Sequence, residues 1–180
     1  HLIQADHASG GSAGNSMIAT ALMGAPTYMS CKVAQDTDGD IYLSDLEQSG
    51  VAHGLNDQRK EGVTGKCLVL ITPDAERSLN THLGISETLS VDEVNEEAIK
   101  ASQWVYLEGY LVTSPTGHAA ALKTKALAAQ HQIQTAVSFS DPGMVKFFRD
   151  NMAAMVEGGV DLVFCNKIEA LEWGQCDSLD

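Results

Sequence analysis

Residues 135–142, TAVSFSDP, carry the pattern that decides the fold: a short apolar strand that runs into a helix start. Strand-forming residues come first, and Asp141-Pro142 then supplies an N-cap residue followed by a proline at the first helical position. Strand patterns also occupy 104–107 and 160–165, each again followed by a helix start. Three strand–loop–helix units in succession predict parallel strands joined by right-handed crossovers, which is an α/β fold.

The other two helix starts of this half carry equally clear signals. Ser114-Pro115 repeats the cap-plus-proline device and opens a helix that we expect to run to Gln130. Asn166 directly follows a strand, and Glu169 stands three residues later as a capping-box partner. Ligands of parallel sheets collect at the carboxyl ends of the strands, so these helix starts mark the edge where a site is expected.

The remaining segments predict further helices and strands of the same layered fold, with one departure from it. Helices are expected over 12–23, over 39–48 and from the Ser90–Glu93 capping box to about Lys100, and a strand is expected over 27–33. Residues 67–72 and 77–83 are strand candidates joined by the turn-like sequence Pro73-Asp74-Ala75-Glu76. This pair predicts a β excursion from the main layer.

Composition and charge exclude several classes of protein. The 180 residues are 44% hydrophobic and 19% charged, which is typical of a globular chain and not of a disordered one. The net charge of −13 repels phosphate backbones and anionic membrane faces, so we expect no nucleic-acid or membrane partner. The apolar runs are far shorter than a membrane helix, and residues 1–6 lack the basic and apolar regions of a signal peptide.

The cysteines favour a reducing compartment. None of the four forms a C-x-x-C pair, and Cys31, Cys67 and Cys165 lie in apolar, strand-like runs. Buried free thiols are expected at these positions, and a cytoplasmic location follows from them.

A glycine-rich stretch, Gly10-Gly11-Ser12-Ala13-Gly14-Asn15, leads into the first predicted helix. Paired glycines let a ligand approach the backbone closely, and the amides of a helix N-terminus can donate to its oxygens. The spacing is not G-x-G-x-x-G, and no strand-like run precedes it. Two interpretations stand: a plain glycine turn before a helix, or part of a binding site.

Two further stretches resemble ligand loops but depart from the required pattern. In 62–67 the glycines are too close together for a phosphate loop, and Cys67 replaces the Ser or Thr that magnesium needs. In 36–47 the carboxylates match the positions of a calcium loop, but Ile41 stands where that loop requires glycine. We favour an acidic helix start there, which the helix dipole stabilises.

The stretch Asn166-Lys167-Ile168-Glu169 also allows two interpretations. Asn166 and Glu169 form a capping box in the structural one. In the functional one, an amide and a carboxylate at the carboxyl end of a strand hold hydrated Mg²⁺ and phosphate oxygens.

Taken in order, these pieces resemble the ribokinase-like (PfkB) family of carbohydrate kinases, which contains ribokinase, fructokinase and adenosine kinase. The resemblance runs along essentially the whole chain through short motifs, which are 10–15, 36–40, 46–51, Thr64-Gly65, Glu108 and 166–169. The run 72–77 looks similar to the adenosine-kinase-like sugar kinases. The resemblance implies a three-layer α/β/α fold with a mostly parallel sheet, and a small β lid to which about 62–84 contribute.

The resemblance also implies an activity and a set of site residues. It implies ATP-dependent phosphorylation of a sugar or nucleoside hydroxyl with Mg²⁺, and an open lid edge through which two copies could pair as a homodimer. Gly10, Gly11 and Asn15 would face the sugar hydroxyls, with Glu108 near the sugar. Asn166 and Glu169 would lie near the magnesium and the ATP phosphates, with Glu169 contacting the metal through water.

Three parts of the family pattern are missing from residues 1–180. The family's Gly-Ala-Gly-Asp stretch, which supplies the anion hole and the catalytic base, does not occur in residues 1–180, so we assign no catalytic residue. The adenine-binding segments and the opening strand are missing too. We therefore expect residues 1–180 to be a partial kinase domain that is inactive by itself. The alternative is a non-catalytic sugar-binding or interaction module of the same fold; an oxidoreductase is disfavoured by the glycine pattern.

Overall fold

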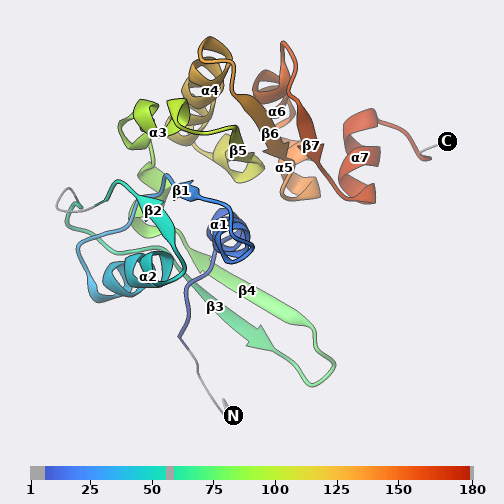
Figure 1. Ribbon diagram of the computed structural model, residues 1–180. Coiled ribbons are helices and arrows are strands. Elements are labelled where there is room, and N and C mark those ends of the chain that lie inside the picture. Colours follow the sequence, from blue (N-terminus) through green and yellow to red (C-terminus); the bar gives the residue numbers. More distant parts are fainter. Residues whose placement is uncertain (1–6, 56–58, 179–180) are drawn as a thin grey trace. The chain divides into compact units, whose positions relative to one another are not determined.

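The computed structural model describes residues 7–55 and 59–178, which form two compact units that divide between Thr88 and Leu89 (Figure 1). Residues 1–6, whose sequence predicts no signal peptide, lie outside the described residues. Among the described residues, no helix combines the length and the apolarity that crossing a membrane would take.

The first unit contains two helices and a pair of short parallel strands (Figure 1). In chain order these are α1 (Ser12–Leu22), β1 (Thr27–Met29), α2 (Thr37–Gln48) and β2 (Val51–His53). In the strand pair, Thr27 faces Val51 and Met29 faces His53. The core of the unit is centred on Leu46, which is fully buried, and Val51. Burial of this apolar cluster holds the two helices against the strands.

The predicted strand over 27–33 is shorter than expected, and β2 was not predicted. Residues 31–34 are buried, but backbone groups of Lys32 and Ala34 bond to side chains of later residues. The carbonyl of Lys32 accepts from Ser86 Oγ at 2.9 Å, and the amide of Ala34 donates to Thr64 Oγ1 at 3.0 Å. Side chains thus replace the strand partner that would extend β1.

An antiparallel hairpin follows in the first unit. Its strands are β3 (Lys66–Ile71) and β4 (Arg77–His82), close to the predicted ranges and joined by the predicted turn. The turn is closed by the amide of Thr72, which donates to the carbonyl of Glu76 at 3.0 Å. Every residue of both strands is exposed, so the described residues cover neither face of the hairpin.

The second unit is built on three parallel strands. These are β5 (Trp104–Glu108), β6 (Gln134–Ser138) and β7 (Leu162–Phe164), in the order β5-β6-β7. Its helices are α3 (Glu96–Lys100), α4 (Pro115–Gln130), α5 (Pro142–Phe147), α6 (Arg149–Val156) and α7 (Lys167–Gly174). Its short 3-10 turns are η2 (Val91–Glu93) and η3 (Gly109–Thr113), whereas η1 (Gly84–Thr88) belongs to the first unit. The core gathers around Val137, Val145 and Met152, which are fully buried. The predicted parallel arrangement is confirmed.

The helix starts of this unit are capped as predicted. Ser114 Oγ accepts from Gly117 N at 3.0 Å, and Asp141 Oδ1 accepts from Gly143 N at 2.7 Å. Asn166 Oδ1 accepts from Glu169 N at 2.9 Å. Each side chain therefore satisfies a backbone amide that the first helical turn leaves unpaired.

The expected helix from Ser90 to Lys100 is wrong in its extent. The Ser90–Glu93 capping box is present, but it caps only the η2 turn. Val94 is extended, with φ −82° and ψ 112°, and Asn95 then caps the separate helix α3 through a bond from Ala98 N at 3.0 Å. The second cap competes with continuation of the first turn, so the segment splits in two.

The expectation of buried thiols holds at Cys31 only. Cys31 is 8% exposed, and burial raises the pKa of its thiol to about 12. Cys67 and Cys165 are exposed free thiols, and so the prediction for them is wrong. Cys67 lies on the hairpin whose two faces are open, and Cys165 follows β7, whose residues are also exposed.

Truncation of Met152 tests the core of the second unit. Its side chain is fully buried, so Met152→Ala should lower the free energy of unfolding by about 2–5 kcal/mol. The matched control is Met23→Ala, since Met23 is 87% exposed, and it should change stability by no more than about 0.5 kcal/mol. Urea unfolding followed by circular dichroism measures both, and equal losses would contradict the assignment of the core.

Candidate active site

The glycine turn presents backbone and side-chain groups at the start of α1. Gly11 is the N-cap residue with φ +94°, a conformation that glycine adopts without steric strain, and it offers no side chain to cap the helix. Asn15, in the first turn of α1, is exposed, and its side chain makes no hydrogen bond within the described part of the chain. Gly14 has a packing role, because an added Cβ would lie 2.6 Å from Tyr42 Oη. Gly10, Gly11 and Asn15 therefore remain available to a ligand.

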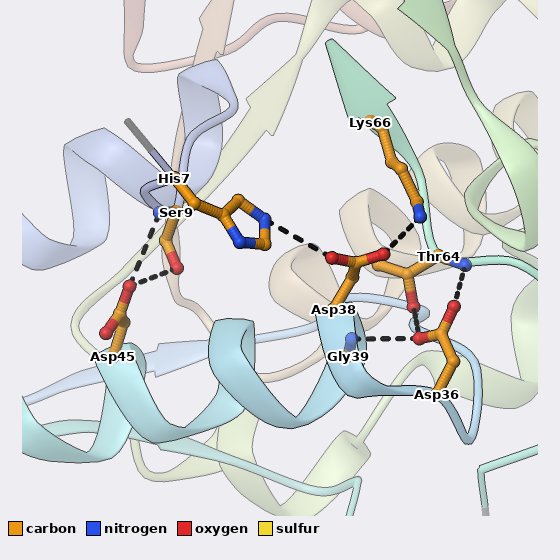
Figure 2. A network of polar contacts seen from close by, with 8 residues as sticks. All are labelled: His7, Ser9, Asp36, Asp38, Gly39, Asp45, Thr64 and Lys66. Atoms are coloured by element: carbon orange, nitrogen blue, oxygen red, sulfur yellow. Dashed lines mark hydrogen bonds and ion pairs between the residues drawn. The ribbon is translucent and has the colours of Figure 1, made fainter. Parts of the chain in front are cut away.

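The carboxylate of Asp36 joins the start of α2 to the base of the hairpin (Figure 2). It accepts from Gly39 N and Thr64 N, each at 2.9 Å, and from Thr64 Oγ1 at 2.5 Å. Partial burial opposes ionisation, but the bonds from Thr64 and Gly39, helped by the charge of Lys66, hold the pKa of Asp36 below its ordinary value. Asp36 is therefore an N-cap that also fixes the loop leading into β3.

The other carboxylates of the acidic helix start also have protein partners. Asp38 pairs with Lys66 and lies 3.3 Å from His7 Nε2, as Figure 2 shows, and Asp40 pairs with Arg59 Nη2 at 2.6 Å. The hydrogen bond to Asp38 raises the pKa of Lys66. Within the described residues, no three His, Cys, Asp or Glu side chains gather as a metal site. The predicted acidic helix start is confirmed.

In the second unit, Glu108 closes β5 at the carboxyl edge of the sheet. Its side chain is buried, with 8% of the residue exposed, and each of its oxygens accepts from a hydroxyl. Tyr106 Oη donates to Oε1 at 2.9 Å, and Ser140 Oγ donates to Oε2 at 2.7 Å. Ser140 Oγ also accepts from Gly109 N at 2.8 Å. The carboxylate is thereby held in one orientation.

Three acidic groups of this edge lie near enough to Tyr110 to affect the pKa of its phenol. Burial raises the pKa of its phenol, and the negative charges of Asp141, Glu108 and Glu169 raise it further. These carboxylates belong to the loops and helix starts that follow β5, β6 and β7. The structure therefore brings Glu108 and the Asn166–Glu169 stretch to one edge of one sheet.

The Asn166–Glu169 capping box is present and uses both side chains. Glu169 Oε2 accepts from Asn166 N at 3.0 Å, and Glu169 Oε1 accepts from Asn166 Nδ2 at 2.8 Å. Glu169 is only 5% exposed. A carboxylate so engaged fits contact with hydrated Mg²⁺ through water and does not fit direct coordination. The structural interpretation holds, and it leaves room for an outer-sphere contact.

The predicted site residues thus fall into two groups. Gly10, Gly11 and Asn15 lie together in the first unit, and Glu108 lies with Asn166 and Glu169 in the second. The sequence analysis missed Tyr106 and Ser140, the two donors to Glu108. Tyr106 stands two residues before Glu108 on the same strand face, which is a usable signal. No sequence signal identifies Ser140, because its contact with Glu108 depends on the backbone turn at residues 139–141.

Comparison with known proteins identifies the family of the chain. A family profile described as pfkB family carbohydrate kinase matches residues 3–178. The chain belongs to this family. An adenosine kinase of Schizophyllum commune is 32% identical over 143 residues, which cover 75% of this chain and 40% of that protein. A ribokinase of Mus musculus is 23% identical over 126 residues, which cover 70% of this chain and 38% of that protein.

Solved structures extend the similarity of this pfkB family chain to the fold. The adenosine kinase of Sinorhizobium meliloti is 33% identical, with a TM-score of 0.89 over 96% of this chain and 53% of that one. A probable sugar kinase of Rhizobium etli CFN 42 is also 33% identical, with a TM-score of 0.89 over 95% and 52%. The predicted ribokinase-like α/β fold and its adenosine-kinase-like branch are confirmed. The chain spans about half the length of these structures, and a smaller share of the curated relatives.

The Asp36 anchor predicts a pH-dependent stability. Because the pKa of Asp36 is lowered in the folded state, its contribution is fully present above the ordinary value of 3.8 and is lost as the pH falls through the lowered value. Asp36→Asn removes the charge and should lower the free energy of unfolding by about 1 kcal/mol at neutral pH. The gap between the two proteins should close as the solution is acidified.

Urea unfolding of both proteins at a series of pH values measures that gap. Asp150→Asn is the control, because Asp150 is exposed on α6 and takes part in no hydrogen bond or ion pair among the described residues. A gap between wild type and Asp36→Asn that is constant down to strong acid would contradict the anchor.

Proposed function

We propose that the protein carrying this chain transfers the γ-phosphoryl group of ATP to a hydroxyl of a sugar or nucleoside. The observation that carries the proposal is the buried Glu108 carboxylate, held by two hydroxyl donors at the carboxyl edge of a parallel sheet in a pfkB family chain. A carboxylate fixed in this way is an acceptor for hydroxyl donors, and hydroxyls are what a sugar or ribose presents.

The glycine turn supplies complementary groups. Asn15 has an amide that can both donate to and accept from a hydroxyl, and the Gly10–Gly11 turn has no side chain to obstruct close approach. These groups would bind hydroxyls of the acceptor, and positioning of the reactants is the main contribution that a protein makes to phosphoryl transfer.

ATP and Mg²⁺ would meet the Asn166–Glu169 stretch. Bound Mg²⁺ would neutralise charge on the transferring phosphoryl group. Glu169 would accept hydrogen bonds from water bound to the metal, and Asn166 would hold the Glu169 side chain through the capping box. The base and the anion hole are not assigned to any of these 180 residues.

The hairpin would serve as a lid that excludes water from the transfer. Asp36 ties its base to α2, so movement of the hairpin would act on the start of that helix. A homodimer formed through the hairpin stays a prediction; Leu68, Ile71 and Leu79, each more than half exposed, would supply its contacts with a second copy. The cytoplasmic location also stays a prediction.

An ATP-consumption assay tests the proposed function. The complete protein should release ADP only when Mg²⁺ and one acceptor from a panel of pentoses, hexoses and nucleosides are both present. Adenosine comes first in the panel, because two relatives are named adenosine kinases. Residues 1–180 alone should show no turnover, because transition-state donors and a base each contribute about 10²–10³-fold or more.

Other outcomes of this assay would decide between the alternatives. Acceptor-dependent turnover by residues 1–180 alone, after removal of contaminating kinases, would contradict the expected inactivity. Binding of a sugar by the complete protein without any turnover would favour the non-catalytic binding module.

Replacement of Asn15 tests the substrate side. If its amide bonds the acceptor, Asn15→Ala in the complete protein should lower kcat/KM by the equivalent of about 1–3 kcal/mol, with little change in melting temperature. Gln130→Ala is a matched control, because Gln130 is an exposed amide at the end of α4. Unchanged kinetics together with a large fall in melting temperature would mean that Asn15 is structural.

A further inference from the structure

Ser140 has a backbone conformation that its residue type does not favour. It lies between the end of β6 at Ser138 and Asp141, the N-cap of α5, and its φ is +67°. The amide of Asp141 donates to the carbonyl of Phe139 at 2.7 Å, which closes the turn around Ser140. Glycine adopts this left-handed conformation without steric strain, whereas serine does not. The turn alone would favour glycine at this position, so the presence of a serine needs another explanation.

The hydroxyl of Ser140 bonds to the last residue of β5 and to the residue after it. It donates to Glu108 Oε2 at 2.7 Å and accepts from Gly109 N at 2.8 Å. The turn directs the hydroxyl to this place, because Ser138 Oγ accepts from the Ser140 amide at 3.1 Å and so fixes the backbone. Strained residues of this kind concentrate at functional sites.

Glu108 needs such an anchor because no cation holds it. Among the described residues, it forms no ion pair with Lys, Arg or His, although it is buried. Its partners are the hydroxyls of Ser140 and Tyr106, one on each oxygen. An ionised carboxylate offers about four acceptor positions, so each oxygen keeps one for a further donor.

We propose that Ser140 is a positioning residue, whose hydroxyl holds Glu108 in the orientation in which it receives a hydroxyl of the substrate. The inference rests on the proposed function, in which Glu108 contacts the acceptor. Ser140 would fix the Glu108 carboxylate before the substrate binds, so binding would not have to restrict rotation of the Glu108 side chain.

Ser140→Gly in the complete protein is the decisive variant. It relieves the backbone at φ +67° but leaves Glu108 Oε2 and the buried Gly109 amide without the Ser140 hydroxyl, so we expect these opposing effects to lower the melting temperature only modestly. The kcat/KM for the hydroxyl acceptor should fall about tenfold, mostly through a higher KM, while the KM for ATP changes less than twofold. Gln132→Gly is the matched control: Gln132 also has a positive φ, of 59°, but is exposed and remote from Glu108 in the turn after α4.

Two further variants separate positioning from a structural role. Tyr106→Phe removes the other donor to Glu108 but keeps the ring against Phe164, and should change the acceptor KM in the same direction. Glu108→Gln should lower kcat/KM, and adding Ser140→Gly to it should cause no further loss, because Ser140 acts through Glu108.

The possible results distinguish this inference from the proposed function. Wild-type protein that phosphorylates no acceptor would contradict the proposed function. With active wild type, normal kinetics of Ser140→Gly, equal effects on both substrates, or losses that add to those of Glu108→Gln would overturn the role of Ser140. Selective and non-additive loss supports it.

Discussion

Parallel pairing of β5, β6 and β7 is the constraint on which the second unit depends. Parallel neighbours cannot be joined by a tight turn, so the chain must leave each strand at one edge and return to the other through a helix. Every exit therefore lies at the carboxyl edge, and Glu108, Ser140 and Asn166 meet there although more than 50 residues separate the first from the last. The site is a consequence of the connection rule.

The same edge has to satisfy the first-turn amides of each helix, and this demand uses up many of its polar side chains. One side-chain oxygen each of Ser114, Asp141 and Asn166 accepts a hydrogen bond from a first-turn amide. In the first unit, by contrast, α1 begins at a glycine without a side-chain cap. The Asn15 side chain in its first turn has no hydrogen bond among the described residues. A polar side chain in the first turn of a helix is thus a better candidate for ligand binding when it does not bond to the helix's own amides.

Local signals explain what could be predicted from the sequence and what could not. The cap and proline at Ser114-Pro115 predict the start of α4 correctly, because steric and hydrogen-bonding preferences act within one turn. The three-residue strand β2 is too short to show a period, and β1 ends early because Ser86 and Thr64 supply its later hydrogen bonds. Tertiary contacts of that kind leave no local pattern. The binding roles expected of Glu108 and Asn15 rest on family resemblance and not on spacing.

The carboxylates show how partners separate structural groups from available ones. In the first unit, Asp36, Asp38 and Asp40 resemble a metal loop by spacing, yet each is matched by a cation or a set of hydrogen-bond donors of the protein. Those contacts offset the repulsion that an acidic chain would otherwise concentrate at one helix start.

Glu108 differs from Asp38 and Asp40, which pair with cations, because its donors among the described residues are two hydroxyls. It differs from Asp36 in being buried at the carboxyl edge of a parallel sheet. A buried carboxylate is costly unless hydrogen bonds satisfy its oxygens. The proposed binding role of Glu108 therefore rests on its burial and on the acceptor positions that its two hydroxyl donors leave open.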